Sequence, residues 1–151
     1  MAGITPLSHG SLKIKGMDPN EARSIIGYVP QNSQINWNFP LSVKQVVEMG
    51  LITKNTFNPF SNRKNDAIVE DSLNKVGLIE KISENINNLS GGQLQRVLLA
   101  RTLTQGADIL LLDEAFSAVD IGAEDDLMKL INNIKQDGKT ILIATHDINN
   151  V

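Results

Sequence analysis

With 151 residues, 41% of them hydrophobic, the chain has the length and composition of a single domain with one ordinary core. It has no cysteine and no apolar run near the roughly 18 residues of a membrane span, which excludes a disulfide framework, a thiolate metal site and a membrane helix. Its net charge of −3, with acidic and basic residues interspersed, leaves no positive stripe for a phosphate backbone, so we expect a soluble, cytoplasmic protein with no nucleic acid as partner.

The first half of the chain predicts two short strands followed by two helices. We expect them over 11–15, 25–29, 43–49 and 64–76. Leu12 and Ile14 alternate as in a half-buried strand, and Pro30 ends the second strand. Ser42 is placed to cap the first helix, and Gly77 stops the second.

The second half alternates helices with apolar strands. We expect helix, strand, helix and strand over 91–104, 109–112, 124–136 and 140–145. Ser90 fits the N-cap of the first of these helices. Near-continuous apolar strands joined by a helical crossover are typical of a parallel sheet covered on both faces, so the predicted class is α/β.

Polar residues follow both apolar strands, where ligands bind in open parallel sheets. Asp113 and Glu114 end the first strand, and His146 and Asp147 follow the second. Each group alone has an ordinary explanation, because acids form solvated turns and a lone histidine caps or packs. Two carboxylates and an imidazole at one sheet edge favour a functional site.

The segment Leu89-Ser90-Gly91-Gly92-Gln93 directly precedes a predicted helix. Its two glycines let the backbone approach an anion, the serine supplies a hydroxyl, and the helix start offers unpaired N–H groups. A plain turn with a helix cap would also explain the five residues. The segment is therefore a candidate phosphate contact whose meaning depends on the motifs that follow.

In order along the chain, LSGGQLQR, ILLLDEAFSAVD and ILIATHD resemble the signature motif, the Walker B motif with its D-loop, and the H-loop of ABC ATPases. Gln31, after Tyr28-Val29-Pro30, resembles the Q-loop glutamine. The resemblance runs from about Leu12 to the end of the chain. It implies a P-loop NTPase-like α/β fold, with a mostly parallel core sheet and a helical subdomain. Residues 1–151 would form a partial ABC ATPase domain, with about 32–104 as the helical subdomain and signature region and the remainder as the RecA-like core.

The resemblance also implies roles in ATP hydrolysis. Asp113 would orient a Mg²⁺ ion, usually through water, and Glu114 would polarise the attacking water as general base. His146 would contact the γ-phosphate, and Gln31 would link the metal to the transmembrane partner. By itself Gln31 would be taken for a polar loop residue.

A second set of residues would act across a homodimer, on the ATP of the other subunit. It consists of the signature residues and the D-loop, namely Ser90, Gly91, Gly92, Gln93, Ser117 and Asp120. Ser117 and Asp120 could also be simple turn and N-cap residues. The other implied partner is a transmembrane permease, which would hold the protein on the cytoplasmic face of the membrane.

Three departures from the family pattern affect what we expect of the chain. It contains no G-x-x-x-x-G-K-[ST], the loop that cradles the phosphates, so we expect a piece of a longer protein that hydrolyses no ATP alone and exposes 140–145 as an aggregation-prone edge. The chain also stops at Val151, before the family's closing elements. Ala115 replaces a usual proline, and Leu94 replaces a commonly polar residue of the signature helix.

The transported substrate is predicted from a weaker similarity. Trp37-Asn38-Phe39-Pro40 and the loop over 57–60 are similar to the ATPases of manganese, zinc and iron importers, although such residues could simply fill the helical subdomain. We therefore expect import of a divalent metal or a metal chelate. The alternative is a soluble ABC ATPase of the iron–sulfur assembly or DNA-repair type, and the chain shows neither a coiled-coil insertion nor a basic face.

Overall fold

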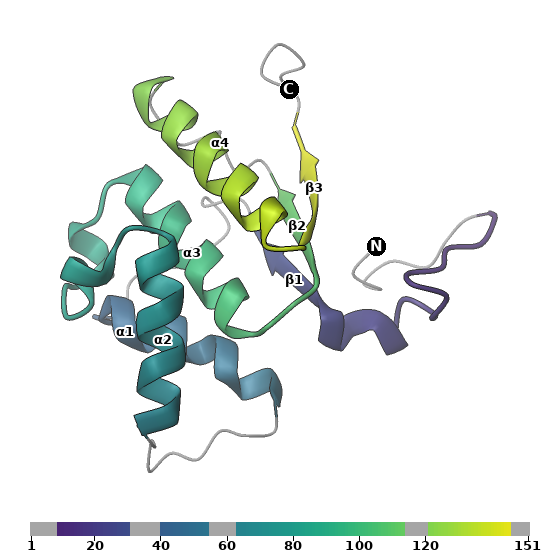
Figure 1. The fold of residues 1–151 in the computed structure, drawn as a ribbon, viewed down its shortest axis with the longest axis horizontal. Helices are drawn as coiled ribbons and strands as arrows, with labels where there is room; N and C mark the ends of the chain where they lie inside the picture. The colour runs from purple at the N-terminus through teal and green to yellow at the C-terminus, as the bar shows by residue number, and fades with distance from the viewer. Residues whose placement is uncertain (1–8, 31–39, 55–62, 114–120, 146–151) are drawn as a thin grey trace.

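The computed structural model describes residues 9–30, 40–54, 63–113 and 121–145, which form a parallel sheet with helices packed against it (Figure 1). The strands are β1 (Ile26–Val29), β2 (Ile109–Asp113) and β3 (Thr140–Ala144). The helices are α1 (Val43–Glu48), α2 (Arg63–Lys75), α3 (Gly91–Thr104) and α4 (Ile121–Gln136), with 3₁₀ helices at Glu21–Ile25, Met49–Lys54, Ile79–Lys81 and Ile86–Asn88. No described helix is long and apolar enough to cross a membrane.

The three described strands are parallel and run in the order β1-β2-β3, so the predicted parallel sheet is confirmed. Leu110 and Leu112 are buried on one face of β2, and Ile141 and Ile143 of β3 pack on the same core from that side. Leu111 and Leu142, on the other face, are half-exposed. We expected helices on both faces, whereas the described residues cover one.

Helix α3 is the centre of the packing and lies between the helices α1 and α2 and the sheet (Figure 1). Val97 and Leu98 are fully buried in it. Gly27 allows β1 to approach α3 closely, because a Cβ there would collide with the side chain of Thr102. Leu94 is 8% exposed within this core, which explains an apolar residue at that position of the signature helix.

The predicted strand over 11–15 was wrong. Ile14 and Met17 exchange two backbone hydrogen bonds of 3.0 Å around a tight turn, in which Lys15 and Gly16 have φ of 50° and 80°. The chain reverses before the five predicted residues can form a strand, and the segment lies away from α1, α2, α3 and α4 (Figure 1). It is held at the amino edge of the sheet by an ion pair of 2.8 Å between Lys15 and Asp108.

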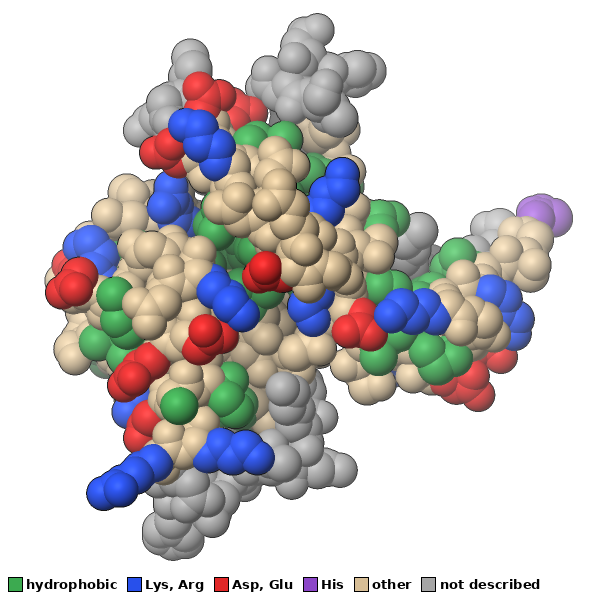
Figure 2. Space-filling view, in the orientation of Figure 1, with side chains coloured by type: hydrophobic (Ala, Val, Ile, Leu, Met, Phe, Trp, Pro, Cys, Tyr) green, Lys and Arg blue, Asp and Glu red, His purple; other side chains and the backbone are tan. Residues whose placement is uncertain are grey.

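The other elements agree with the sequence except at their ends. The expected helix over 43–49 ends as an α-helix at Glu48 and continues as a 3₁₀ helix, and α4 begins three residues before the expected Glu124. Helix α3 begins and ends at the predicted residues, Gly91 and Thr104. Figure 2 shows acidic and basic side chains interspersed over the face that it draws.

Candidate functional site

The described part of the predicted site begins at Asp113, the last residue of β2. The register aligns Asp113 with Ala144 of β3, so it lies at the carboxyl edge of the sheet. Its Oδ2 accepts a hydrogen bond of 2.7 Å from the hydroxyl of Tyr28 in β1. Because Tyr28 pairs with Leu111, and Asp113 is two positions further, both side chains are on the half-exposed face of the sheet.

The hydrogen bond to Asp113 is the largest cause that raises the pKa of Tyr28 above its ordinary value. Partial burial of the phenol and the negative charge of Asp113 raise the pKa further, since both disfavour the phenolate. The pair is therefore a neutral phenol that donates to a carboxylate.

A second aspartate, just before β2, has different surroundings. Asp108 lies at the amino edge of the sheet, 2.8 Å from the Nζ of Lys15 and 3.7 Å from that of Lys139. The hydrogen bond and the charge of Lys15 lower the pKa of Asp108, and Lys139 lowers it less. Within the described residues, Asp113 has no such cationic partner.

A carboxylate without a cationic partner fits a magnesium site. Mg²⁺ prefers oxygen ligands and is commonly held by one or two carboxylates together with substrate phosphates and water. The described residues contain no cluster of three or more acidic, histidine or cysteine side chains that could hold a metal by themselves. Asp113 therefore fits a metal that arrives with a phosphate ligand.

The signature segment begins helix α3 with a capping box. Ser90 Oγ accepts a hydrogen bond of 3.3 Å from the backbone N–H of Gln93, and the Ser90 N–H donates to Gln93 Oε1 at 3.1 Å. The N-cap predicted from the sequence is confirmed. The backbone N–H groups of Gly91 and Gly92 have no hydrogen-bond partner among the described residues, and both glycines are half-exposed. The start of α3 can therefore accept an anion.

The comparisons with known proteins agree with these motifs. The profile of the ABC transporter family matches residues 1–117. The chain belongs to the ABC transporter family. It is 39% identical over 146 residues to the manganese transport system ATP-binding protein MntB of Bacillus subtilis, covering 97% of this chain and 58% of that protein.

Two further matches are also named as parts of transport systems. The chain is 42% identical over 151 residues to the chelated iron transport system membrane protein YfeB of Yersinia pestis, covering 99% of the chain and 51% of that protein. Among solved structures it resembles cbiO1 of Clostridium perfringens, part of the ABC transporter complex cbiONQ, with a TM-score of 0.84, 30% identity and coverage of 99% and 61%. The fold is thus the P-loop NTPase-like α/β fold of ABC ATPases. The chain spans about half the length of these curated relatives.

Half of the predicted site of this ABC family chain lies outside the described residues. This group consists of Gln31, Glu114, Ser117, Asp120 and His146. Of the predicted residues that are described, Asp113 and the segment 90–93 are joined by no described hydrogen bond or ion pair. The structure therefore leaves them as two separate groups.

Sequence reasoning missed Tyr28 as a possible site residue. The available signal was an aromatic residue with a polar tip, one position before the end of a strand that points to the expected ligand edge. Its partner lies 85 positions further along the chain, and only the pairing of β1 with β2 brings the two together.

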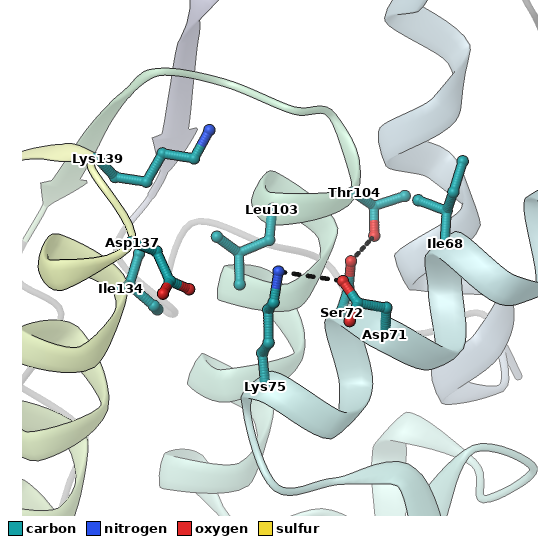
Figure 3. Close-up of a pocket in the computed structure, with 9 residues that line it drawn as sticks. All are labelled: Ile68, Asp71, Ser72, Lys75, Leu103, Thr104, Ile134, Asp137 and Lys139. Atoms are coloured by element: carbon teal, nitrogen blue, oxygen red, sulfur yellow. Dashed lines mark hydrogen bonds and ion pairs between the residues drawn. The ribbon is translucent and has the colours of Figure 1, made fainter.

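A described pocket of about 530 Å³ contains none of the predicted site residues. It lies between α2, α3 and the end of α4, and its polar groups largely bind one another (Figure 3). Lys75 pairs with Asp71 at 3.1 Å, and the Thr104 hydroxyl lies 2.8 Å from that of Ser72. We assign it no part in the site.

Proposed function

We propose that this chain is part of the ATP-binding subunit of an ABC importer that couples ATP hydrolysis to uptake of a divalent metal or a metal chelate. The observation that carries the proposal is Asp113, a carboxylate without a cationic partner among the described residues, at the carboxyl edge of a family-typical sheet. The relatives named for manganese and chelated-iron transport support the substrate class.

In this proposal the residues that follow β2 and β3 carry the chemistry. Asp113 would hold Mg²⁺, which would supply charge stabilisation to the phosphates when bound. Glu114 accepts a proton from the attacking water as that water adds to the γ-phosphorus of ATP, and ADP leaves. His146 orients the γ-phosphate, and Gln31 connects the site to the permease.

The start of α3 acts on the ATP of a second subunit. The unpartnered N–H groups of Gly91 and Gly92, together with the exposed Ser90, would bind the γ-phosphate across a homodimer. Gln93 keeps Ser90 in place through the capping box, and Ser117 and Asp120 would line the same dimer contact. The subunit would be attached to the cytoplasmic face of the membrane by its permease.

The test uses this chain completed with the remaining sequence of the Bacillus subtilis relative, which we call the completed hybrid. Glu114→Gln should lower its ATP turnover by about 10² to 10⁴-fold, because the amide cannot accept the proton. ATP-dependent dimerisation, measured by size-exclusion chromatography, should persist. Glu70→Gln, on the exposed side of α2, is the matched control and should leave turnover unchanged. Wild-type turnover in Glu114→Gln would contradict the proposed base.

Transport is tested in a Bacillus subtilis strain that lacks its manganese transport ATP-binding protein. The completed hybrid should restore manganese uptake, and its Glu114→Gln variant should not. ATP turnover without any restored uptake would favour the non-transport ATPase instead.

A further inference from the structure

Tyr28 and Asp113 form the shortest polar contact described at the carboxyl edge of the sheet. The phenol donates to Oδ2 at 2.7 Å, within the range of a hydrogen bond strengthened by the charge of its acceptor. Both side chains are half-buried, so solvent competes less with this contact than with an exposed one.

The position of the contact follows from the sheet register. Tyr28 pairs with Leu111, which places its backbone two residues, or about 7 Å along the strand, before Asp113. A tyrosine is long enough to cross this distance over the sheet face. Phenylalanine would cover the same surface without supplying the donor.

A hydroxyl donor differs in its effect from the lysines that hold Asp108. Lys15 and Lys139 place positive charge beside that carboxylate, which would oppose the approach of a cation. The hydroxyl of Tyr28 carries no net charge, so it fixes one oxygen of Asp113 and preserves the negative charge of the group.

We propose that Tyr28 is a positioning residue for Asp113, which holds this carboxylate in the orientation that receives Mg²⁺ with ATP. The proposal rests on the proposed function, because it assigns Tyr28 a part in the same site. Groups that orient metal-binding side chains commonly contribute about 10 to 100-fold to metal affinity or activity. The loss of one hydroxyl should therefore be visible in metal binding.

The experiment compares Tyr28→Phe, Asp113→Asn and Asp108→Asn in the completed hybrid. Mn²⁺ serves as the probe, and its affinity in the presence of ATP is measured by electron paramagnetic resonance. Tyr28→Phe should weaken Mn²⁺ binding by about 10-fold, with Asp113→Asn weakening it at least as much. Asp108→Asn should leave it unchanged. In turnover assays, Tyr28→Phe should raise the Mg²⁺ concentration for half-maximal rate while the rate at saturating Mg²⁺ stays near wild type.

Thermal unfolding of the same variants separates positioning from folding. Tyr28→Phe keeps the ring and should melt near the wild-type temperature. Mn²⁺ affinity within twofold of wild type in Tyr28→Phe, together with a clear loss in Asp113→Asn, would overturn the role of Tyr28 and leave the proposed function standing. An unchanged affinity in both variants would overturn the metal-binding role of Asp113 and with it both proposals.

Discussion

Helices α1 and α3 begin with the same capping box. Ser42 Oγ accepts from the Gln45 N–H at 3.3 Å, and the Ser42 N–H donates to Gln45 Oε1 at 2.9 Å. At α3 the corresponding distances between Ser90 and Gln93 are 3.3 and 3.1 Å. By the cap alone, the two helix starts are equivalent.

They differ in the backbone N–H groups that follow the cap. At α1 the N–H groups of Val43 and Lys44 donate to the carbonyl oxygens of Glu84 and Ile82, both at 2.9 Å. The first two N–H groups of α3 have no partner among the described residues. Backbone carbonyl groups of the chain thus satisfy the first N–H groups of α1, whereas those of α3 are available to an anion. A serine cap by itself does not distinguish the two kinds of helix start.

The largest expected effect comes from an arginine at the α3 cap, compared with the same substitution at the α1 cap. In the completed hybrid carrying Glu114→Gln, Ser90→Arg should weaken the ATP-dependent dimer at least about 30-fold, the effect of about 2 kcal/mol at a central contact. Ser42→Arg should not weaken it, because that helix start is closed. Analytical ultracentrifugation with ATP measures both, and equal losses in the two variants would remove the distinction between them.

Alanine at the two caps should have equal effects on stability. Ser42→Ala and Ser90→Ala should each lower the free energy of unfolding of the chain by about 1 kcal/mol, because each loses the same side-chain acceptor. Urea unfolding followed by circular dichroism measures this. If Ser42→Ala lowered the free energy of unfolding and Ser90→Ala did not, the α3 cap would serve binding alone.

The glutamines of the two boxes should matter less than the serines. Gln45→Ala and Gln93→Ala each remove one exposed hydrogen bond to the cap N–H, at a cost of about 0.5 kcal/mol. Amide hydrogen exchange at Ser42 and Ser90 should become faster in the respective variant. Unchanged exchange at either serine would show that the glutamine contact there is not maintained in solution.

The smallest effect concerns an ion pair at the start of α1, which has no counterpart at the start of α3 among the residues that the structure describes. The Nζ of Lys44 lies 2.8 Å from a carboxylate oxygen of Asp66 of α2 and 3.7 Å from one of Glu48, and the close contact with Asp66 is the main cause that raises the pKa of Lys44. The side chain of Lys44 is 40% exposed, so solvent screening limits the stabilisation to a few tenths of a kcal/mol.

A raised pKa means that this stabilisation is fully present below the ordinary value of 10.5 and is lost as the pH rises through the higher value of the folded state. Asp66→Asn should therefore be slightly less stable than wild type near neutral pH, with the difference shrinking in strongly alkaline solution. Asp71→Asn, which breaks the neighbouring pair with Lys75 on α2, is the control and should leave the pKa of Lys44 unchanged. A pH-independent difference for Asp66→Asn would contradict the assigned cause.

The features predicted correctly from the sequence are those that a few adjacent residues decide. Both N-caps depend on a serine three positions before a glutamine. The apolar run of β2 ends at Leu112 because the charged Asp113 follows it. The expected strand over 11–15 was wrong because the chain reverses at Lys15 and Gly16, and the alternation at Leu12 and Ile14 does not reveal that turn.

The sequence by itself determined the ABC family, the α/β class, the helices with their caps and the candidate Asp113, because periodicity, capping and motif order are local. The tertiary structure alone decided that Asp108 pairs with lysine side chains and Asp113 with the hydroxyl of Tyr28. Tyr28 and Lys139 come near their partners through the pairing of the strands, and Lys15 through the turn between Ile14 and Met17. The tertiary structure also decided at which helix start the first N–H groups are hydrogen-bonded by the chain's own carbonyl groups. The carbonyl groups that close α1 come from a segment some forty positions later, and no pattern around Ser42 announces them.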